Sequence, residues 1–251
     1  MVPSPCQCHC FYCDVHKKYN HFHYDDELKK TYEKAFDVLN LAKRQRIIAP
    51  VGMAHWQLSS GEIAIHPYRK EMLDLVRGEN VSFFTNGFIF DEGIARELHD
   101  NPMSDINISI DSGTAETWNK VKGVNNFQKV LENLVNYRKC SCRPGQITVK
   151  YIVLPGVNDS DKDFFSCVNI LKALEVTSFS LSRDIAISRS VKNREQSRGG
   201  EILDEAVLYS AARLLAVCLF ATGISPVLHG TFTLKERETI IRLSNNMLSK
   251  I

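Results

Sequence analysis

The sequence predicts an α/β fold in which a mostly parallel β-sheet is covered by helices and curves towards a barrel. Three observations predict it. Apolar segments of strand length alternate with helical segments along most of the chain, an order typical of parallel strands joined by crossover helices. A single layer of helices, on one side of the sheet, suits a chain of 251 residues. Polar segments follow the predicted strands, where barrels of this kind carry their active sites.

Composition and charge describe an ordinary globular chain. Hydrophobic residues make up 44% and charged residues 24% of it, and the formal net charge of +2 indicates neither nucleic acid nor an anionic membrane as a partner. No apolar run approaches the roughly 20 residues of a membrane span, and the N-terminal residues lack the features of a signal peptide. Because cysteines crowd before residue 14 without a secretory signal, they indicate a metal site in a reducing, cytoplasmic compartment.

The expected elements follow one another in regular order. An apolar stripe through Leu28, Tyr32 and Leu39 predicts the first helix, and Ser160 with Asp163 forms a capping box that starts another. The helices are predicted at residues 25–46, 66–77, 91–99, 126–138, from 160 onwards, 201–222 and 234–248. The strands are predicted at residues 47–51, 81–84, 106–110, 147–154, 176–181 and 224–228.

Residues 185–200 interrupt this order. They are rich in arginine, lysine and serine and almost free of large apolar side chains, which predicts a solvated, mobile loop, with a phosphate-binding lid as the alternative. We therefore expect two parts in the chain. Residues 1–183 form the core barrel with the N-terminal cysteines, and residues 184–251 supply the basic loop and the C-terminal helices that complete the barrel or its substrate side.

The N-terminal cysteines are the strongest chemical signal. Cys6, Cys10 and Cys13 are separated by three residues and then two, a loop too short to turn all three into a packed core. Clustered thiolates bind zinc or iron–sulfur clusters, and their softness does not choose between them. Cys8 lies within the same loop, so a zinc knuckle built from Cys6 or Cys8 with Cys10 and Cys13 stays open as an alternative.

This spacing, with the aromatic Tyr12 before the last cysteine, resembles the signature of the radical S-adenosylmethionine (radical SAM) superfamily. The resemblance implies that Cys6, Cys10 and Cys13 bind three irons of a [4Fe–4S] cluster, that the fourth iron takes S-adenosylmethionine, and that Tyr12 is among the residues that bind this cofactor. It also implies a partial (β/α)6 barrel of the TIM type. Only five residues precede the cysteines, so the first strand of that barrel is expected to be short, around Val2, or missing.

Further segments resemble the same family. Ser60-Gly61-Glu62 is similar to its Gly-Gly-Glu segment, which implies that Ser60, Gly61 and Glu62 hold the methionine ammonium of the cofactor. A carboxylate can fix such an amine by charge-assisted hydrogen bonds. The structural alternative for Glu62 is an acid that faces solvent at a helix N-terminus.

The ends of later strands also match. Ser109-Ile110-Asp111 resembles the family's Ser-Leu-Asp, which implies that Ser109 and Asp111 contact the cofactor, and Val157 takes the place of an aliphatic residue packed against adenine. Thr85-Asn86-Gly87 is similar to the turn after the third strand. Lys122 replaces an arginine of the family, so a bidentate grip on a carboxylate is not expected there.

The resemblance implies an enzyme that reductively cleaves S-adenosylmethionine to methionine and a 5′-deoxyadenosyl radical, which removes hydrogen from a substrate. An electron donor such as flavodoxin or ferredoxin would be its partner. The substrate stays open among small molecules, sugars, peptides, lipids and nucleosides, and no catalytic acid or base can be named. Cys140 and Cys142 are too few for an auxiliary cluster. The alternatives are a zinc-binding interaction module and a relative of the family without turnover.

Overall fold

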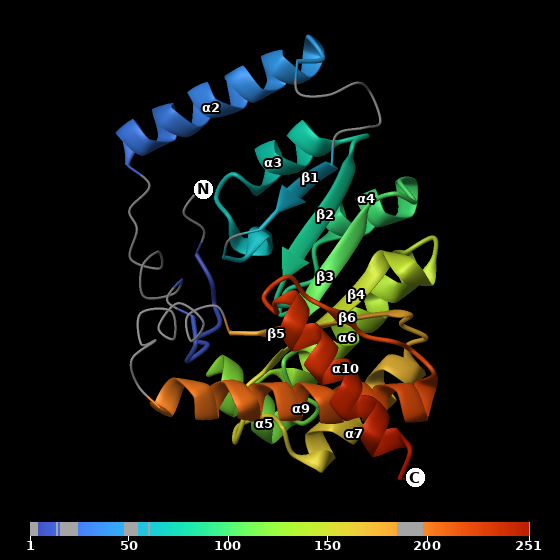
Figure 1. Ribbon diagram of the computed structural model, residues 1–251. Helices are drawn as coiled ribbons and strands as arrows, with labels where there is room; N and C mark the ends of the chain where they lie inside the picture. Colours follow the sequence, from blue (N-terminus) through green and yellow to red (C-terminus); the bar gives the residue numbers. More distant parts are fainter. Residues whose placement is uncertain are drawn as a thin grey trace.

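A computed structural model describes residues 5–13, 15, 25–47, 55–59, 61–184 and 198–250. Its centre is a single sheet of six strands (Figure 1), in which every neighbouring pair is parallel. The strands are β1 (His55–Leu58), β2 (Asn80–Thr85), β3 (Asp105–Ser109), β4 (Ile147–Val153), β5 (Ser178–Arg183) and β6 (Val227–Leu228). Each strand pairs with its predecessor in the chain, and the sheet does not close because β1 and β6 do not meet. The predicted fold, a partial barrel of parallel strands, is confirmed.

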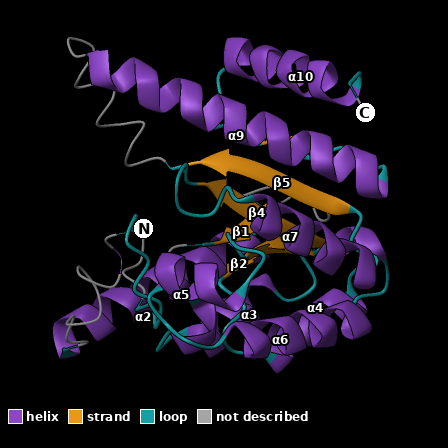
Figure 2. Cartoon of the chain, turned by 90° about the horizontal axis from the view of Figure 1, so that it is seen from below, coloured by secondary structure: helices purple, strands orange, loops and turns teal. Residues whose placement is uncertain are grey.

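Helices between the strands cover one side of the sheet, and others pack on those helices. They are α2 (Asp26–Arg44), α3 (Arg69–Val76), α4 (Glu92–Asp100), α5 (Ala115–Lys122), α6 (Phe127–Cys140), α7 (Asp161–Ala173), α9 (Arg198–Thr222) and α10 (Leu234–Leu248), with short 3-10 turns at Ile63–Ile65 and Pro144–Gln146. Of these, α2 packs on α3 and α10 packs on α9. Figure 2 shows α9 beside β5, with α10 stacked on the far side of α9.

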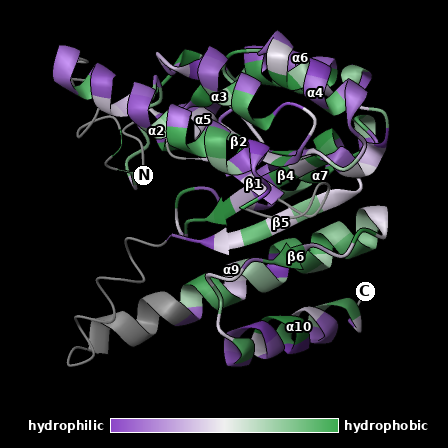
Figure 3. Ribbon diagram, turned by 90° about the horizontal axis from the view of Figure 1, so that it is seen from above, coloured by the Kyte–Doolittle hydropathy of each residue, from purple (hydrophilic) through white to green (hydrophobic). Residues whose placement is uncertain are grey.

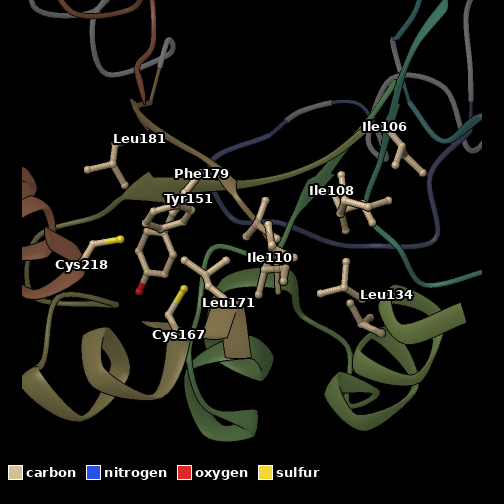
Figure 4. Packing of buried hydrophobic residues seen from close by; sticks show 14 of the residues in the cluster. Ile106, Ile108, Ile110, Leu134, Tyr151, Cys167, Leu171, Phe179, Leu181 and Cys218 are labelled. Atoms are coloured by element: carbon tan, nitrogen blue, oxygen red, sulfur yellow. The ribbon is translucent and has the colours of Figure 1, made fainter. Parts of the chain in front are cut away.

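The core lies between the sheet and these helices. Alternate residues of β3 and β4, such as Ile108 and Tyr151, are fully buried and pack with Leu134 of α6 and Leu171 of α7 (Figure 4). Side chains of a strand alternate between the two faces of its sheet. The opposite face therefore carries a second set of residues that is mostly polar: Ser82, Asn107, Ser109, Thr148, Lys150, Ser178, Ser180 and Ser182.

One prediction near the N-terminus was wrong in part. Ile47, expected to begin a strand, is exposed and lies outside any strand, while residues 48–51 fall outside the described residues. The observed strand is β1, at residues 55–58. Only its Trp56 and Leu58 pack on the core, so the alternation of exposed and partly buried side chains repeats only twice. Residues 1–4, where a first strand was expected, also lie outside the described part, and in that part no strand precedes β1.

The other elements agree with prediction within a few residues, and α5 is additional. Its N-cap Thr114 accepts a hydrogen bond from the Thr117 amide, and Gly123 ends it in the left-handed conformation, the usual chemistry of both helix ends.

Helix α9 contains one long apolar stretch. Residues Glu205–Thr222 are long and apolar enough to cross a membrane by length and composition. Figure 3 shows the hydrophobic character of α9 between the sheet and α10. Packing explains it, because Val207, Leu214 and Cys218 are buried in the core and α9 contacts β4, α7 and α10. The basic loop predicted at residues 185–200 falls mostly outside the described residues.

Candidate cluster and cofactor site

The cysteine loop, residues 5–13, is held against the carboxyl ends of the strands. The Glu62 amide, after β1, donates to the Pro5 carbonyl at 2.9 Å, and the His9 amide donates to the Lys122 carbonyl at 2.7 Å. Gln7 Nε2 donates to Oδ1 of Asn86, after β2, at 3.2 Å. Three separate segments therefore fix the loop at the edge of the sheet where parallel barrels place their active sites.

Gly123 permits the closest of these approaches. Its φ is +66°, and a Cβ at this position would lie 2.9 Å from both the Cβ and the carbonyl oxygen of His9. A larger residue would push the cysteine loop away from the end of α5, so glycine is needed here for space as well as for conformation.

The loop presents its cysteines as free thiols. The Cys13 amide donates to the Cys10 carbonyl at 3.0 Å, which folds the last part of the loop into a turn, and Asn86 Nδ2 lies 3.5 Å from Cys6 Sγ. Hydrogen bonding from Cys8 lowers the pKa of Cys6, and it lowers that of Cys10 to about 6. Cys8, which lies between Cys6 and Cys10 in the sequence, is buried.

The donor set fits an iron–sulfur cluster. In the described part of the chain no three His, Cys, Asp or Glu side chains already surround one metal position. Cys6, Cys10 and Cys13 nevertheless supply soft sulfur donors on one loop, and Cys6 and Cys13 are partly exposed. Thiolates of this kind are the protein ligands of [4Fe–4S] clusters. The prediction that Cys8 is not a ligand is not tested by this arrangement and stays a prediction.

Glu62 is fully buried between β1 and β2. Its carboxylate accepts hydrogen bonds from the Thr85 hydroxyl at 2.8 Å, the Asn86 amide at 2.8 Å and the Ala64 amide at 3.3 Å. Burial raises the pKa of Glu62 to about 7, although these hydrogen bonds oppose the rise. The structural alternative, an acid that faces solvent, is wrong, because Glu62 ties two strand ends together beside the cysteine loop.

Asp111 and Lys122 form a buried ion pair below the cysteine loop. Asp111 Oδ2 also accepts from the Tyr12 hydroxyl at 2.7 Å, and Oδ1 accepts from the Ile152 amide at 2.6 Å. Lys122 Nζ donates to the Tyr12 hydroxyl at 3.1 Å and lies 5.5 Å from the ring centroid of Trp118. Burial by itself would lower the pKa of Lys122, but the charge and hydrogen bond of Asp111 and the charges of the nearby cysteines together outweigh it, and the net shift is upward.

Asp111 adopts a left-handed backbone conformation, with φ of +52°. Such a conformation is uncommon for a residue other than glycine and persists where the surroundings hold it. Asn158 stabilises this conformation, because its Nδ2 donates to the Asp111 carbonyl at 2.9 Å and to the Ile152 carbonyl at 2.8 Å. The ends of β3 and β4 are thereby joined by one buried side chain.

The remaining predicted site residues fall at the same edge. Ser109 is the last residue of β3, Gly61 has φ of +75° directly before Glu62, and Val157 lies in the turn after β4, where its amide donates to the Leu154 carbonyl at 3.0 Å. Ser60 lies outside the described residues.

Sequence reasoning missed the partners that hold this site. Asn86 was interpreted only as part of a turn, Asn158 was not singled out, and Lys122 was discounted because it replaces an arginine. The spacing of residues along the chain does not show such contacts, which join residues between 11 and 110 positions apart. The one available signal was the presence of a lysine in an otherwise apolar helix face.

Comparison with known proteins identifies relatives. The family model of the Radical SAM superfamily matches residues 4–168. A GTP 3′,8-cyclase of Microcystis aeruginosa is 26% identical over 150 residues, which cover 56% of this chain and 43% of the cyclase. A probable GTP 3′,8-cyclase of Archaeoglobus fulgidus is 26% identical over 166 residues, which cover 64% of this chain and 50% of that cyclase. The chain thus spans about half the length of these relatives.

Solved structures share the fold at lower identity. SuiB of Streptococcus suis bound to the precursor peptide SuiA is similar with a TM-score of 0.64 and 12% identity, over 91% of this chain and 48% of SuiB. The enzyme anSMEcpe with bound AdoMet and a peptide is similar with a TM-score of 0.59 and 17% identity, over 90% of this chain and 60% of its own.

Proposed function

The chain belongs to the radical SAM superfamily, whose enzymes use a [4Fe–4S] cluster and S-adenosylmethionine, and from this premise we propose its individual reaction. Bound together, the two groups would supply reductive cleavage of S-adenosylmethionine and a 5′-deoxyadenosyl radical that takes a hydrogen atom from the substrate. The substrate class of the family is a small molecule or a peptide.

One observation carries this proposal. The cysteine loop is hydrogen-bonded to the segments that follow β1, β2 and α5, and the predicted cofactor residues lie at the ends of β1, β3 and β4. The predicted cluster ligands and the described residues among the predicted cofactor contacts, although distant in sequence, lie at one edge of the sheet, which supports the proposal.

We assign the roles of the residues accordingly. Cys6, Cys10 and Cys13 hold the cluster. We assign the methionine amine to Ser60, Gly61 and Glu62, where the ionised Glu62 would stabilise an ammonium. Ser109 and Val157 contact the rest of the cofactor.

Tyr12 and Asp111 have a supporting role in this arrangement. The Tyr12 hydroxyl and both carboxylate oxygens of Asp111 already have partners within the protein. Their contacts fix the cysteine loop to β3 and β4, so they orient the cluster ligands and keep water out of the space between loop and sheet.

The two parts of the chain have different proposed roles. Residues 1–183 form the catalytic core, and residues 184–251 add the segment that completes the substrate side. The curated relatives make a purine nucleotide the first substrate to test, and flavodoxin or ferredoxin is the proposed electron donor. A cytoplasmic location fits that partner.

The decisive experiment measures cofactor cleavage without substrate. Protein purified and reconstituted anaerobically should be brown and contain iron and acid-labile sulfide, whereas a zinc module would be colourless. With dithionite and S-adenosylmethionine it should form 5′-deoxyadenosine slowly, because an open site lacks the contacts that commit the reaction. Cys10→Ala is the matched control without turnover. A filled cluster and bound cofactor that yield no 5′-deoxyadenosine under any reductant would refute the proposal.

A further inference from the structure

The turn after β4, residues 154–159, lies open to solvent at its tip, residues 155–157. Gly156 is exposed and Val157 is partly buried, and a Cβ at Gly156 would meet nothing within 4 Å. Because packing contributes little to the position of the tip, hydrogen bonds must fix it. Val157 is the residue assigned to the adenine of the cofactor, so the position of the tip bears on cofactor binding.

The base of this turn is anchored to the sheet. The Leu154 amide donates to Asn158 Oδ1 at 2.8 Å, and Asn158 Nδ2 donates in turn to the carbonyls of Asp111 and Ile152. These contacts hold the two ends of the turn to β3 and β4. They do not involve residues 155–157, so the tip needs a support of its own.

Asp159 links the tip to α9. Its Oδ1 accepts from the Gly156 amide at 2.8 Å, and its Oδ2 accepts from the Ser210 hydroxyl at 2.7 Å. Ser210 lies in α9 and is buried. One turn later in α9, Arg213 donates to the Asp159 carbonyl at 3.0 Å and forms an ion pair with Asp161. One carboxylate thus bridges the tip of the turn and the C-terminal part of the chain.

Apolar packing, rather than these polar contacts, docks α9 on the sheet. Val207 and Leu214 are already buried in the core, and burial of apolar surface is the larger driving force. Among the described residues of α9, those whose side chains hydrogen-bond to earlier segments are Ser210 and Arg213, and both bond within residues 159–161. The polar contacts of α9 therefore converge on the end of this turn.

We propose that Ser210 and Arg213 are positioning residues, through which α9 fixes the tip of the turn where Val157 would contact the adenine of S-adenosylmethionine. They act through Asp159 and touch no cofactor atom themselves. The inference rests on the proposed function for the role of Val157. Because α9 belongs to the part of the chain assigned to the substrate side, these contacts also link that part to the cofactor.

The first test follows the turn in cluster-free protein by hydrogen–deuterium exchange of residues 154–159. Ser210→Ala should raise the exchange rate about tenfold, because a hydrogen bond to a charged group is lost. Ser210→Thr keeps the hydroxyl and should keep the native rate. Ser244→Ala is the matched control, since Ser244 is also buried but its hydroxyl has no partner among the described residues. Equal exchange in Ser210→Ala and Ser244→Ala would overturn the proposal.

The second test titrates cluster-loaded protein with S-adenosylmethionine and with methionine, which carries the amine and the carboxylate of the cofactor but no adenine. The double variant Ser210→Ala, Arg213→Met keeps an unbranched side chain over the Phe164 ring. It should weaken S-adenosylmethionine about tenfold and leave methionine unchanged. A general disturbance of the site would weaken both ligands equally. Equal losses, or an unchanged affinity for S-adenosylmethionine, would therefore overturn the proposal.

Failure of this inference and failure of the proposed function give different results. Native protein that binds no S-adenosylmethionine would refute the proposed function together with the role of Val157. Native binding that the double variant retains in full would refute this inference alone. Thermal unfolding shows that the variants are folded, as expected because the apolar side chains of α9 are unchanged in all of them.

Discussion

Lys122→Met should destabilise the chain strongly, because it leaves the buried carboxylate of Asp111 without its cation. Breaking a buried ion pair from one side costs about 3–5 kcal/mol. Asp111 keeps hydrogen bonds from the Tyr12 hydroxyl and the Ile152 amide, so we expect the lower figure, about 3 kcal/mol. For a chain of this size that corresponds to a fall in the unfolding temperature of roughly 6–12 °C.

The assay is anaerobic thermal and urea unfolding of the cluster-free protein. The double variant Lys122→Met, Asp111→Asn should recover most of the loss, because an asparagine can still accept from the Ile152 amide and carries no charge. Lys120→Met is the matched control from the same helix. Its ammonium pairs with Glu116 in an exposed position, and its removal should leave the unfolding midpoint unchanged.

Two results would refute this reasoning. The first is a Lys122→Met variant whose unfolding midpoint equals that of the Lys120→Met control. The second is a double variant that loses the sum of the two single losses, since strictly additive losses mean that the two charges do not interact.

Three further predictions concern the same edge of the sheet. Cys8→Ala should retain the full iron content after anaerobic reconstitution whereas Cys10→Ala should lose the cluster, and the reverse result would make Cys8 the ligand. Burial raises the pKa of Glu62 from 4.5 to about 7, so the free energy of unfolding should fall by about 3 kcal/mol as the pH rises from 4.5 to 7. Glu62→Gln should flatten this pH dependence. The prediction is contradicted if the native chain and the variant lose stability equally over that pH range. Gly123→Ala should speed thiol labelling of the cysteine loop, because the added Cβ would meet His9. Gly156→Ala is the control, since its φ is also positive but its Cβ would meet nothing within 4 Å. Equal labelling rates in the two variants would show that the contact of Gly123 with His9 does not hold the loop.

The sequence predicted the parts of the fold that depend on local pattern. Strands β2 to β5 and their helices carry clear periodicity, because one face of each is buried in the core. Strand β1 was misplaced because an edge strand of four residues with two packed side chains gives almost no alternation. The apolar run at residues 47–51 resembled a buried strand more closely.

The site was predicted less completely than the fold. Motifs placed Glu62, Ser109 and the cysteines at strand ends, because parallel strands bring their carboxyl ends together. They could not show that the Glu62 carboxylate is already bonded to Thr85 and Asn86. Side-chain contacts of this kind depend on the twist and register of the sheet, which spacing along the chain does not encode.

The contacts of Tyr12 impose an order of events on the newly made protein. Tyr12 precedes its partner Asp111 by 99 positions and Lys122 by 110. Translation at about 5–20 residues per second makes Tyr12 wait roughly 5–20 s before Lys122 exists. During that interval Glu62 and Asn86 are already available to the cysteine loop, but the contacts of Tyr12 with Asp111 and Lys122 cannot form. We therefore expect the loop to reach its final position, ready for cluster insertion, only after synthesis of β3 and α5.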